Sequence, residues 1–290
     1  MEIKGRIAVV TGAGLDAGAG PDDYNIGGAT ALELATRGVK GLALVDRSPT
    51  VADVAARINK TVGRDIAMPF VGDTTDAAFR KQVYDNVEQA TGAMVSICIP
   101  AAGITRDRLA VKLDKEKGEL DIYPEELFRL VTNVNLVAPV YWGLEMVARI
   151  AKDRWKRKMG RWEPKRSLDA NGTGEHIQGT VIFIGSVSSQ GNKGQISYAA
   201  TKAGLEGAAR TLMKEAMFYG VRCGLIHPGF TNTPMVRALG EEYISKNILP
   251  YTQLKRLIYP QEIASAICFL ISNSAVSGEL WADAGWHPSA

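Results

Sequence analysis

Residues 186–202 read SVSSQGNKGQISYAATK and stand between two segments with different hydrophobic patterns. Thr180–Ile184, just before them, is an apolar run rich in β-branched side chains, which predicts a buried strand. Beyond Lys202, small and apolar residues recur with helical spacing. They are Ala203, Leu205, Ala208, Ala209, Leu212 and Met213. The stretch therefore predicts a strand, a polar loop and a helix that begins near Tyr198.

The start of this helix carries two side chains with acid–base chemistry. Tyr198 and Lys202 are four residues apart, so one helical turn places them on the same face. An ammonium beside a phenol favours the phenolate, and we expect Lys202 to lower the pKa of Tyr198 towards neutrality. Tyr198 could then donate or accept a proton near physiological pH. Ser186, at the end of the strand, can face the same point through the loop and hold a substrate oxygen.

Further apolar segments alternate with predicted helices along the chain. Strands are expected at Arg6–Thr11, Gly41–Asp46, Asp65–Val71, Ala93–Ile99, Val221–Ile226 and Gly278–Gly285. This alternation predicts an α/β fold: one doubly wound, Rossmann-like parallel sheet with helices on both faces and right-handed crossovers. With 290 residues, 46% hydrophobic residues and no linker or repeat, we expect a single catalytic domain over residues 1–290.

The stretch around Tyr198 resembles the active-site segment of the short-chain dehydrogenase/reductase family, classical type, and the resemblance covers nearly the whole chain. Residues 103–107, GITRD, are similar to the corresponding part of β-ketoacyl-carrier-protein reductases. The resemblance implies that Tyr198 exchanges a proton with the substrate oxygen, and that Lys202 lowers the pKa of Tyr198 and binds the nicotinamide ribose. It also implies that Ser186 holds the substrate oxygen, with Ser188 as the alternative serine.

The implied reaction is reversible hydride transfer between a nicotinamide cofactor and a secondary alcohol or ketone. Asn135 matches the family's catalytic asparagine, which holds a water that relays protons to the lysine. One alternative is a β-ketoacyl thioester reductase that uses NADPH. An enoyl reductase would space its tyrosine and lysine more widely than four residues. An alternative of another class is a non-catalytic nucleic-acid- or protein-binding member that uses the basic segment 152–166.

A glycine-rich turn follows the first predicted strand. A strand, a glycine turn and a helix N-terminus together form a cradle for a pyrophosphate. The turn resembles the family's Thr-Gly-x-x-x-Gly-x-Gly sequence, with Asn25 in the place of a glycine, where we expect a positive φ. Leu15–Tyr24 is an insertion, expected to be an irregular loop. The predicted contacts are Gly12, Gly14, Asn25, Ile26 and Gly27.

The end of the second strand indicates which cofactor is used. A carboxylate there, Asp46, hydrogen-bonds the adenine ribose hydroxyls and repels a 2′-phosphate. Arg47 could instead accept such a phosphate. We therefore expect NAD, with NADP as the weaker candidate. The resemblance places further cofactor contacts at Asp73, Thr74, Ala101, Ala102, Gly103, Pro228, Gly229, Phe230, Thr231 and Thr233, besides Tyr198 and Lys202.

The substrate site is expected to be apolar, beneath a helical lid near residues 233–258. Its predicted lining is Ile104, Phe230, Met235, Leu239 and Tyr243, with Ser188. Loops that leave strands lie at the active-site edge of a doubly wound sheet, and loops that enter strands lie at the opposite edge. The insertions at 15–24 and 109–123 should therefore border the cofactor or substrate, whereas 152–178 should lie far from the nicotinamide.

The composition limits partners and location. Residues 152–166 hold eight Lys or Arg against two acids, so the net charge of +3 comes from this one segment, which we expect to be a solvated loop or a subunit contact. No apolar run is long enough to span a membrane, and three widely spaced cysteines suit a reducing cytoplasm. His176, His227 and His287 lack ligand spacing, so no metal is expected. The family resemblance implies a small-molecule substrate and a homo-oligomer, a tetramer or a dimer.

Overall fold

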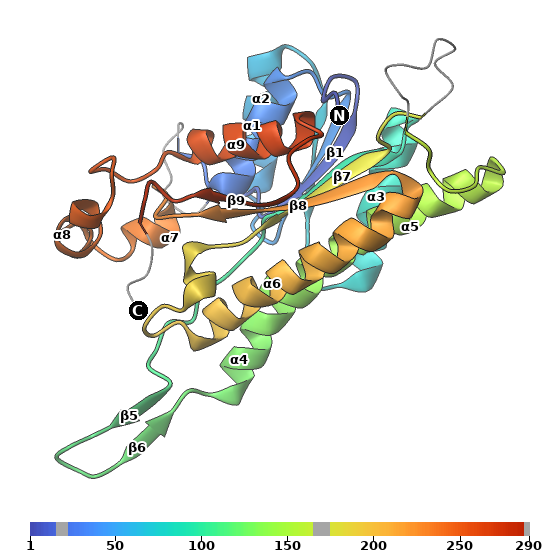
Figure 1. Ribbon diagram of the computed structural model, residues 1–290. Helices are drawn as coiled ribbons and strands as arrows, with labels where there is room; N and C mark the ends of the chain where they lie inside the picture. The colour runs from blue at the N-terminus through green and yellow to red at the C-terminus, as the bar shows by residue number, and fades with distance from the viewer. Residues whose placement is uncertain (16–22, 165–174, 287–290) are drawn as a thin grey trace.

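The computed structural model describes residues 1–15, 23–164 and 175–286, and its centre is a seven-stranded parallel sheet (Figure 1). The strand order is β3-β2-β1-β4-β7-β8-β9. The strands are β1 (Ile7–Thr11), β2 (Gly41–Asp46), β3 (Ala67–Val71), β4 (Val95–Pro100), β7 (Gly179–Ile184), β8 (Val221–Pro228) and β9 (Gly278–Ala282). The order reverses between β1 and β4, where doubly wound sheets bind their ligands. The predicted fold class is confirmed.

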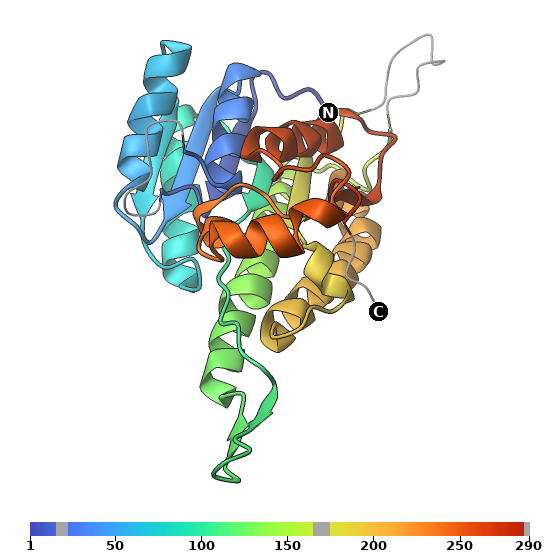
Figure 2. The ribbon, with the colours of Figure 1, turned by 90° about the vertical axis from the view of Figure 1, so that its left-hand side faces the viewer.

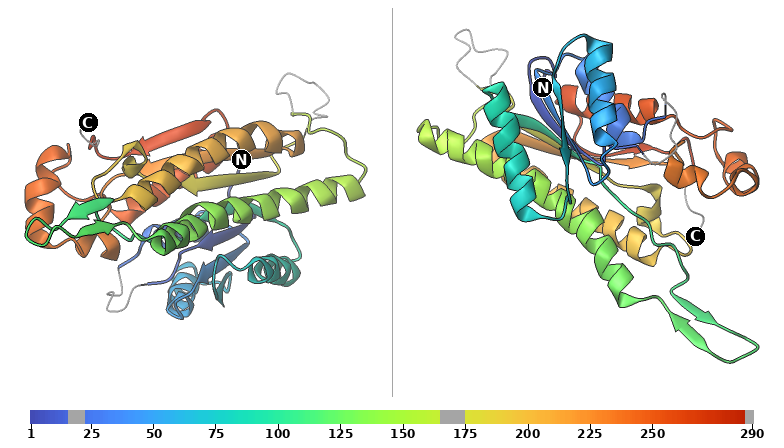
Figure 3. Two further views of the ribbon diagram at one scale, coloured as in Figure 1. Left: turned by 90° about the horizontal axis from the view of Figure 1, so that it is seen from below. Right: turned by 180° about the vertical axis from the view of Figure 1, so that it is seen from behind.

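Helices cover both faces of the sheet, as predicted. One face carries α1 (Ile26–Thr36), α2 (Val51–Val62) and α9 (Pro260–Ser272). The other carries α3 (Ala77–Thr91), α5 (Ala138–Lys156) and α6 (Ile196–Glu215). Seen from below in Figure 3, α5 and α6 lie along the same side of the sheet. The 3₁₀ turns η2 (Val187–Gln190) and η3 (Ala216–Tyr219) flank α6.

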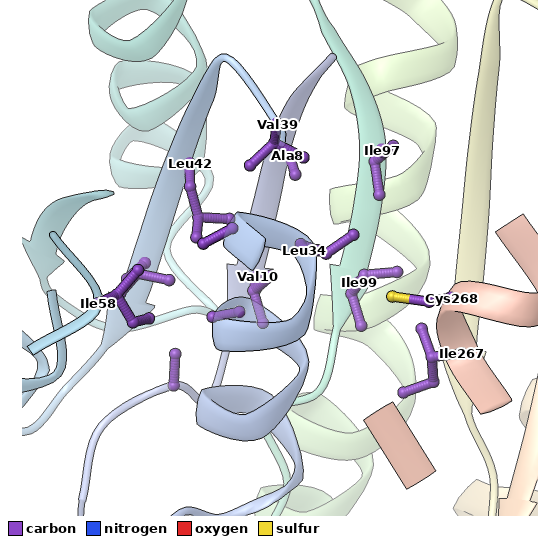
Figure 4. Close-up of a cluster of buried hydrophobic side chains, with 14 of the residues drawn as sticks. Ala8, Val10, Leu34, Val39, Leu42, Ile58, Ile97, Ile99, Ile267 and Cys268 are labelled. Atoms are coloured by element: carbon purple, nitrogen blue, oxygen red, sulfur yellow. The ribbon is translucent and has the colours of Figure 1, made fainter. Parts of the chain in front are cut away.

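The core explains why the strands read as continuous apolar runs. Alternate side chains of β1 point to opposite faces, so Val10 meets α1 and α9 while Val9 packs on the α3–α5–α6 side. Figure 4 shows the first of these layers, in which Leu34 of α1 and Ile267 of α9 lie over the sheet. All four side chains are essentially fully buried, and both faces of the strand are therefore dry.

The last crossover departs from the prediction that all crossovers are right-handed. The chain steps in the same direction across the sheet from β7 to β8 and from β8 to β9. Yet α6 covers one face and α9 the opposite face, against α1. Two connections between parallel strands that move in the same direction across the sheet, but run over opposite faces of it, have opposite handedness. The β8–β9 connection therefore breaks the right-handed rule that the other crossovers follow. The excursion before α9 carries α7 (Pro234–Arg237), α8 (Glu241–Asn247) and the turn η4 (Leu249–Tyr251).

Residues 109–123 form an antiparallel hairpin, β5 (Val111–Leu113) and β6 (Leu120–Ile122), that projects away from the sheet (Figures 1 and 2). Its register puts Val111 opposite Ile122 and Leu113 opposite Leu120, so four aliphatic side chains share one face. Each of them is more than half exposed. The prediction that this insertion borders the cofactor or substrate is wrong for the hairpin itself, because no residue of 109–123 is part of the cleft lining, which includes Arg106 and then Leu130.

The insertion at 152–178 lies at the opposite edge from the carboxyl ends of the strands, since it leads from α5 into the start of β7 (Figure 1). Residues 165–174 fall outside the described chain. The expectation that this basic segment is a solvated loop or a subunit contact is wrong for Arg154, which is buried within the chain, paired with Glu175, and also donates to the Gly160 carbonyl. No helix in the described residues is long and apolar enough to cross a bilayer.

Candidate active site

The carboxyl ends of β1, β2, β4 and β7 open into a cleft of about 560 Å³. Its walls combine the turn after β1, the ends of β2 and β3, the loop after β4 and the start of α6. The predicted residues among its lining are Gly12, Gly14, Asn25, Ile26, Gly27, Asp46, Arg47, Asp73, Thr74, Ala101, Ala102, Gly103, Ile104, Tyr198, Lys202, Thr233 and Met235. The cleft thus gathers segments from most of the chain at the switch point of the sheet.

The turn after β1 fits a pyrophosphate because no side chain could occupy it. A Cβ on Gly27 would lie 2.3 Å from the carbonyl oxygen of Gly12. Gly12 itself has φ +68°, and its Cβ would lie 2.6 Å from the backbone of Ala102. The N-terminus of α1 therefore lies close to the main chain of the turn, with no side chain between them. Such a site suits an anionic cofactor.

Asn25 has a different role from the predicted one. Its φ is −79°, so the positive φ expected at this replaced glycine is wrong. Asn25 instead caps α1: its side-chain oxygen accepts a hydrogen bond from the Gly28 amide, and its amide nitrogen donates to the Gly14 carbonyl. The side chain thus joins the glycine turn to the helix. Residues 16–22 of the insertion lie outside the described chain.

Asp46 ends β2 inside the cleft with a fixed orientation. One carboxylate oxygen accepts from the Gly14 amide and the other from the Ser48 amide, each at 2.9 Å. A Cβ on Gly14 would lie 2.7 Å from the Asp46 side chain, so the two approach as closely as glycine permits. Arg47 is exposed at the rim. The carboxylate is therefore held in a fixed orientation at the wall of the cleft.

Tyr198, Ser186 and Lys202 meet at the start of α6. Ser186 is hydrogen-bonded to the Tyr198 hydroxyl and also caps η2 by accepting from the Ser188 amide. The Lys202 ammonium lies 5.4 Å from the centre of the Tyr198 ring and donates to the Ile184 carbonyl at 2.8 Å. The structure thus brings Ser186 to the tyrosine, whereas Ser188 lies buried against Asn192.

The pKa of Tyr198 differs from the expectation. Burial raises it to about 12, and the hydrogen bond with Ser186 only partly offsets this, while the charge of Asp107 adds to it. Burial lowers the pKa of Lys202 to about 8. The prediction that Lys202 brings the pKa of Tyr198 near neutrality is therefore wrong, because desolvation of the phenol dominates. The phenol of Tyr198 therefore keeps its proton at neutral pH, and Lys202 is the group that titrates nearer to neutral pH.

Asn135 lies in a π-helical turn, η1 (Asn133–Val137), between α4 (Glu125–Thr132) and α5. Its side chain is fully buried and makes two hydrogen bonds to Ile104, accepting from the amide at 2.9 Å and donating to the carbonyl at 2.8 Å. A Cβ on Gly103 would lie 3.5 Å from the Asn135 oxygen and 3.9 Å from Lys202 Nζ. π-Turns often occur at functional sites, and here the turn aims Asn135 at the loop after β4.

Comparisons with known proteins agree with this geometry. A family model described as enoyl-(acyl carrier protein) reductase matches residues 22–287. The 3-oxoacyl-(acyl-carrier-protein) reductases FabG of Salmonella typhimurium and Escherichia coli are each 31% identical over 282 residues, which cover 96% of this chain and 96% of theirs. The chain belongs to the short-chain dehydrogenase/reductase family. A putative gluconate dehydrogenase from Agrobacterium tumefaciens, 23% identical, has the same fold with a TM-score of 0.75, over 98% of this chain and 96% of that one.

As a member of the short-chain dehydrogenase/reductase family, the protein is an NAD(P)-dependent oxidoreductase that acts on a secondary alcohol or a ketone. When bound, the nicotinamide supplies or accepts the hydride, and the protein supplies position and charge. The non-catalytic alternative based on residues 152–166 is thereby set aside. Its buried, paired Arg154 also cannot contribute to a basic binding surface.

The predicted substrate residues are only partly brought together. Ile104 and Met235 line the cleft. Phe230 instead packs edge-on against Trp286, with ring centres 4.8 Å apart. Leu239 and Tyr243, in and beside the short helices of the lid, are 42% and 51% exposed and lie outside the cleft lining. Of the predicted turn after β8, Thr233 lines the cleft, whereas Pro228, Gly229, Phe230 and Thr231 are not part of its lining.

Several lining residues were not predicted from the sequence. They are Leu15, Ser48, Gly72, Thr105, Arg106, Leu130, Val134, Ile184 and Pro234. Most adjoin a predicted residue, so extending each strand end by one or two positions would have found them. Leu130 is different: it lies on α4, away from any predicted residue, and the packing of α4 beside α6 brings it to the cleft.

Proposed function

We propose that Tyr198, Ser186 and Lys202 carry the acid–base chemistry of a ketone reductase or alcohol dehydrogenase, with Asn135 as a positioning residue. One observation supports this above the others: Tyr198 is hydrogen-bonded to Ser186 and lies beside Lys202, in the same cleft as the pyrophosphate turn. In reduction, the carbonyl carbon gains a hydride and the oxygen gains a proton. Tyr198 donates that proton, and Ser186 holds the oxygen.

Lys202 stabilises the phenolate that is left on Tyr198 after the proton moves. Its ammonium is close to the ring and donates to the Ile184 carbonyl, so it needs no rearrangement to act. Asn135 is a positioning residue in this scheme, since its two hydrogen bonds hold the backbone of Ile104 at the wall of the cleft. Oxidation of an alcohol runs through the same groups in reverse.

For the cofactor, we propose NAD(H) in preference to NADP(H). The support is the Asp46 carboxylate, whose oxygens are fixed by the amides of Gly14 and Ser48 and face the cleft. A 2′-phosphate would meet that negative charge. The test compares kcat/KM for NADH and NADPH in the wild type and in Asp46→Ser. A wild-type ratio that favours NADPH, or one that the variant does not shift, would refute the preference.

For the substrate, we propose a fairly apolar ketone or alcohol, with Ile104 and Met235 in contact with it. A second candidate is a 3-oxoacyl thioester, because the curated relatives that match this chain are 3-oxoacyl-(acyl-carrier-protein) reductases. A panel followed by NADH absorbance separates these: cyclic and aromatic ketones, 3-oxoacyl thioesters, short polyols and an enoyl thioester. Efficient use of polyols would contradict the apolar site, and reduction of the enoyl thioester alone would replace the carbonyl reaction.

We also propose a homo-oligomer, a tetramer or a dimer, in the cytoplasm. The support for assembly is the exposed apolar face of the β5–β6 hairpin, together with Val137, Tyr141 and Leu144 on the adjoining helix. The support for a reducing compartment is that all three cysteines are free and buried. Sedimentation velocity at two protein concentrations tests the assembly.

A further inference from the structure

A buried histidine and two carboxylates meet behind the catalytic serine. His227 is the penultimate residue of β8, Glu206 lies on α6, and Glu279 lies on the edge strand β9. One nitrogen of His227 and one oxygen of each glutamate lie within 4.8 Å of one another. His227 is fully buried, and the glutamate side chains are 13% and 17% exposed. The catalytic scheme above uses none of these three residues.

The hydrogen bond at the other side of the imidazole fixes its tautomer. Nδ1 of His227 lies 3.0 Å from the carbonyl oxygen of Ser186, which can only accept, so Nδ1 carries a hydrogen. A neutral His227 then presents the lone pair of Nε2 to the two carboxylates. A ligating histidine is commonly held in this way, by its second nitrogen donating to a carbonyl.

The ring is locked in this orientation. Trp281 stacks on it with ring centres 4.0 Å apart and an interplanar angle of 10°. On the other side a Cβ on Gly185 would lie 2.7 Å from Nδ1, so the backbone there leaves the ring no room to turn. A side chain fixed by both packing and a hydrogen bond is pre-organised for binding.

The facing atoms have unmet bonding capacity. Nε2 of His227 and Oε1 of Glu206 are buried and have no hydrogen-bond partner among the described residues. Nε2 lies 3.5 Å from Glu279 Oε2 and 3.9 Å from Glu206 Oε1. Both separations are too long for a good hydrogen bond. They are close to the separation of about 3.4 Å between two ligands of a tetrahedral ion with bonds of about 2.1 Å.

Arg210 contacts the outer side of this cluster and leaves the side that faces His227 open. Its guanidinium contacts the outer oxygens, 2.7 Å from Glu279 Oε1 and 3.7 Å from Glu206 Oε2. The inner oxygens are thereby turned towards His227. With a neutral imidazole, the cluster of two carboxylates and one guanidinium keeps a charge of minus one, so a cation is still favoured there.

We propose that Glu206, His227 and Glu279 bind one divalent transition-metal ion of the zinc or cobalt class. One imidazole and two carboxylates form a donor set that suits such ions better than Mg²⁺ or Ca²⁺, which prefer oxygen alone. The ion would tie α6, β8 and β9 together and, through the Ser186 carbonyl, brace the loop that carries the catalytic serine. Its role is structural, and no chemical step passes through it.

The test uses the full-length enzyme dialysed against a chelator. Zn²⁺ is titrated against a chromophoric competitor, Co²⁺ binding is followed by visible absorption, and thermal unfolding is measured with and without Zn²⁺. The variants are Glu206→Gln and Glu279→Gln, which keep side-chain size and avoid the buried His227. Glu215→Gln, an exposed position at the end of the same helix α6, is the matched control.

The expected result is one ion per chain in the wild type and in Glu215→Gln, with the thermal midpoint raised by several degrees on adding Zn²⁺. In Glu206→Gln and Glu279→Gln the dissociation constant should rise at least tenfold and the thermal shift should disappear. Equal Zn²⁺ binding by all four proteins would mean that the ion binds a surface side chain such as the exposed His176. This result would overturn the proposal. A wild type that takes up neither Zn²⁺ nor Co²⁺ would also overturn the proposal.

Discussion

Charge on Lys202 should control ketone reduction on the alkaline side of neutrality. Burial lowers the pKa of Lys202 to about 8, so the ammonium is present below that pH and is lost as the pH rises through it. Burial raises the pKa of Tyr198 to about 12, so the tyrosine remains a proton donor over the same range. The rate of reduction is therefore expected to fall above about pH 8, by up to tenfold per unit, because Lys202 loses its proton and not because Tyr198 does.

The size of the effect follows from the distance between the two groups. Lys202 Nζ lies 5.4 Å from the centre of the Tyr198 ring. A unit charge at that distance from a developing phenolate is worth about 3 kcal/mol at an effective dielectric constant of about 20. That energy corresponds to roughly a 200-fold change in rate. Lys202→Met should therefore lower kcat for reduction about 200-fold and remove the alkaline limb near pH 8.

The assay is ketone reduction followed by NADH absorbance from pH 6 to pH 10. Lys202→Arg keeps a charge that does not titrate in this range, so it should retain more activity than Lys202→Met and show no limb near pH 8. Lys214→Met, an exposed lysine near the end of the same helix, is the control and should match the wild type. A wild-type limb that survives in Lys202→Met would assign the titration to another group and refute the reasoning.

Three further changes test separate parts of the site and the assembly. Tyr198→Phe should lower turnover by about 10²–10⁴-fold with the cofactor dissociation constant nearly unchanged, as measured by steady-state kinetics and fluorescence titration. Gly27→Ala should raise the cofactor dissociation constant at least tenfold, since its Cβ would lie 2.3 Å from a carbonyl oxygen, whereas Gly207→Ala, with open space around it, should not. Replacing both Leu120 and Ile122 by Asp should shift the protein to a smaller species in sedimentation velocity, with the monomer's thermal midpoint little changed.

The strands and the catalytic helix were predictable because their signals are local. A parallel strand buried on both faces must be a continuous apolar run, and Thr180–Ile184 is one. The Tyr198–Lys202 pair depends only on helical spacing. Asp46 was found by its place at the end of a strand, and the structure holds it in the cleft. In each case the residues that carry the prediction are adjacent or one turn apart.

Other features depend on tertiary contacts and left no local signal. The handedness of the last crossover follows from the packing of α9 on α1. The hydrophobic periodicity of the sequence does not predict this packing. The negative φ of Asn25 comes from its role as a helix cap across the glycine turn. The high pKa of Tyr198 is a burial effect, whereas sequence spacing reports only the nearby charge. The grouping of His227 with Glu279 likewise appears only once β8 and β9 pair.

The segment between β8 and α9 is where substrate preference can arise. Because β8 ends at the carboxyl edge of the sheet, the chain after it passes along this edge before it reaches α9. That passage carries α7 and α8, and its first residues, Thr233–Met235, line the cleft. Of the rest, Ile244 and Ile248 are buried, whereas Leu239 and Tyr243 stay exposed, so packing restricts these two exposed positions little. Change in this segment can therefore alter which ketone is held beside Tyr198 while the sheet, the glycine turn and the proton-transfer groups remain as they are.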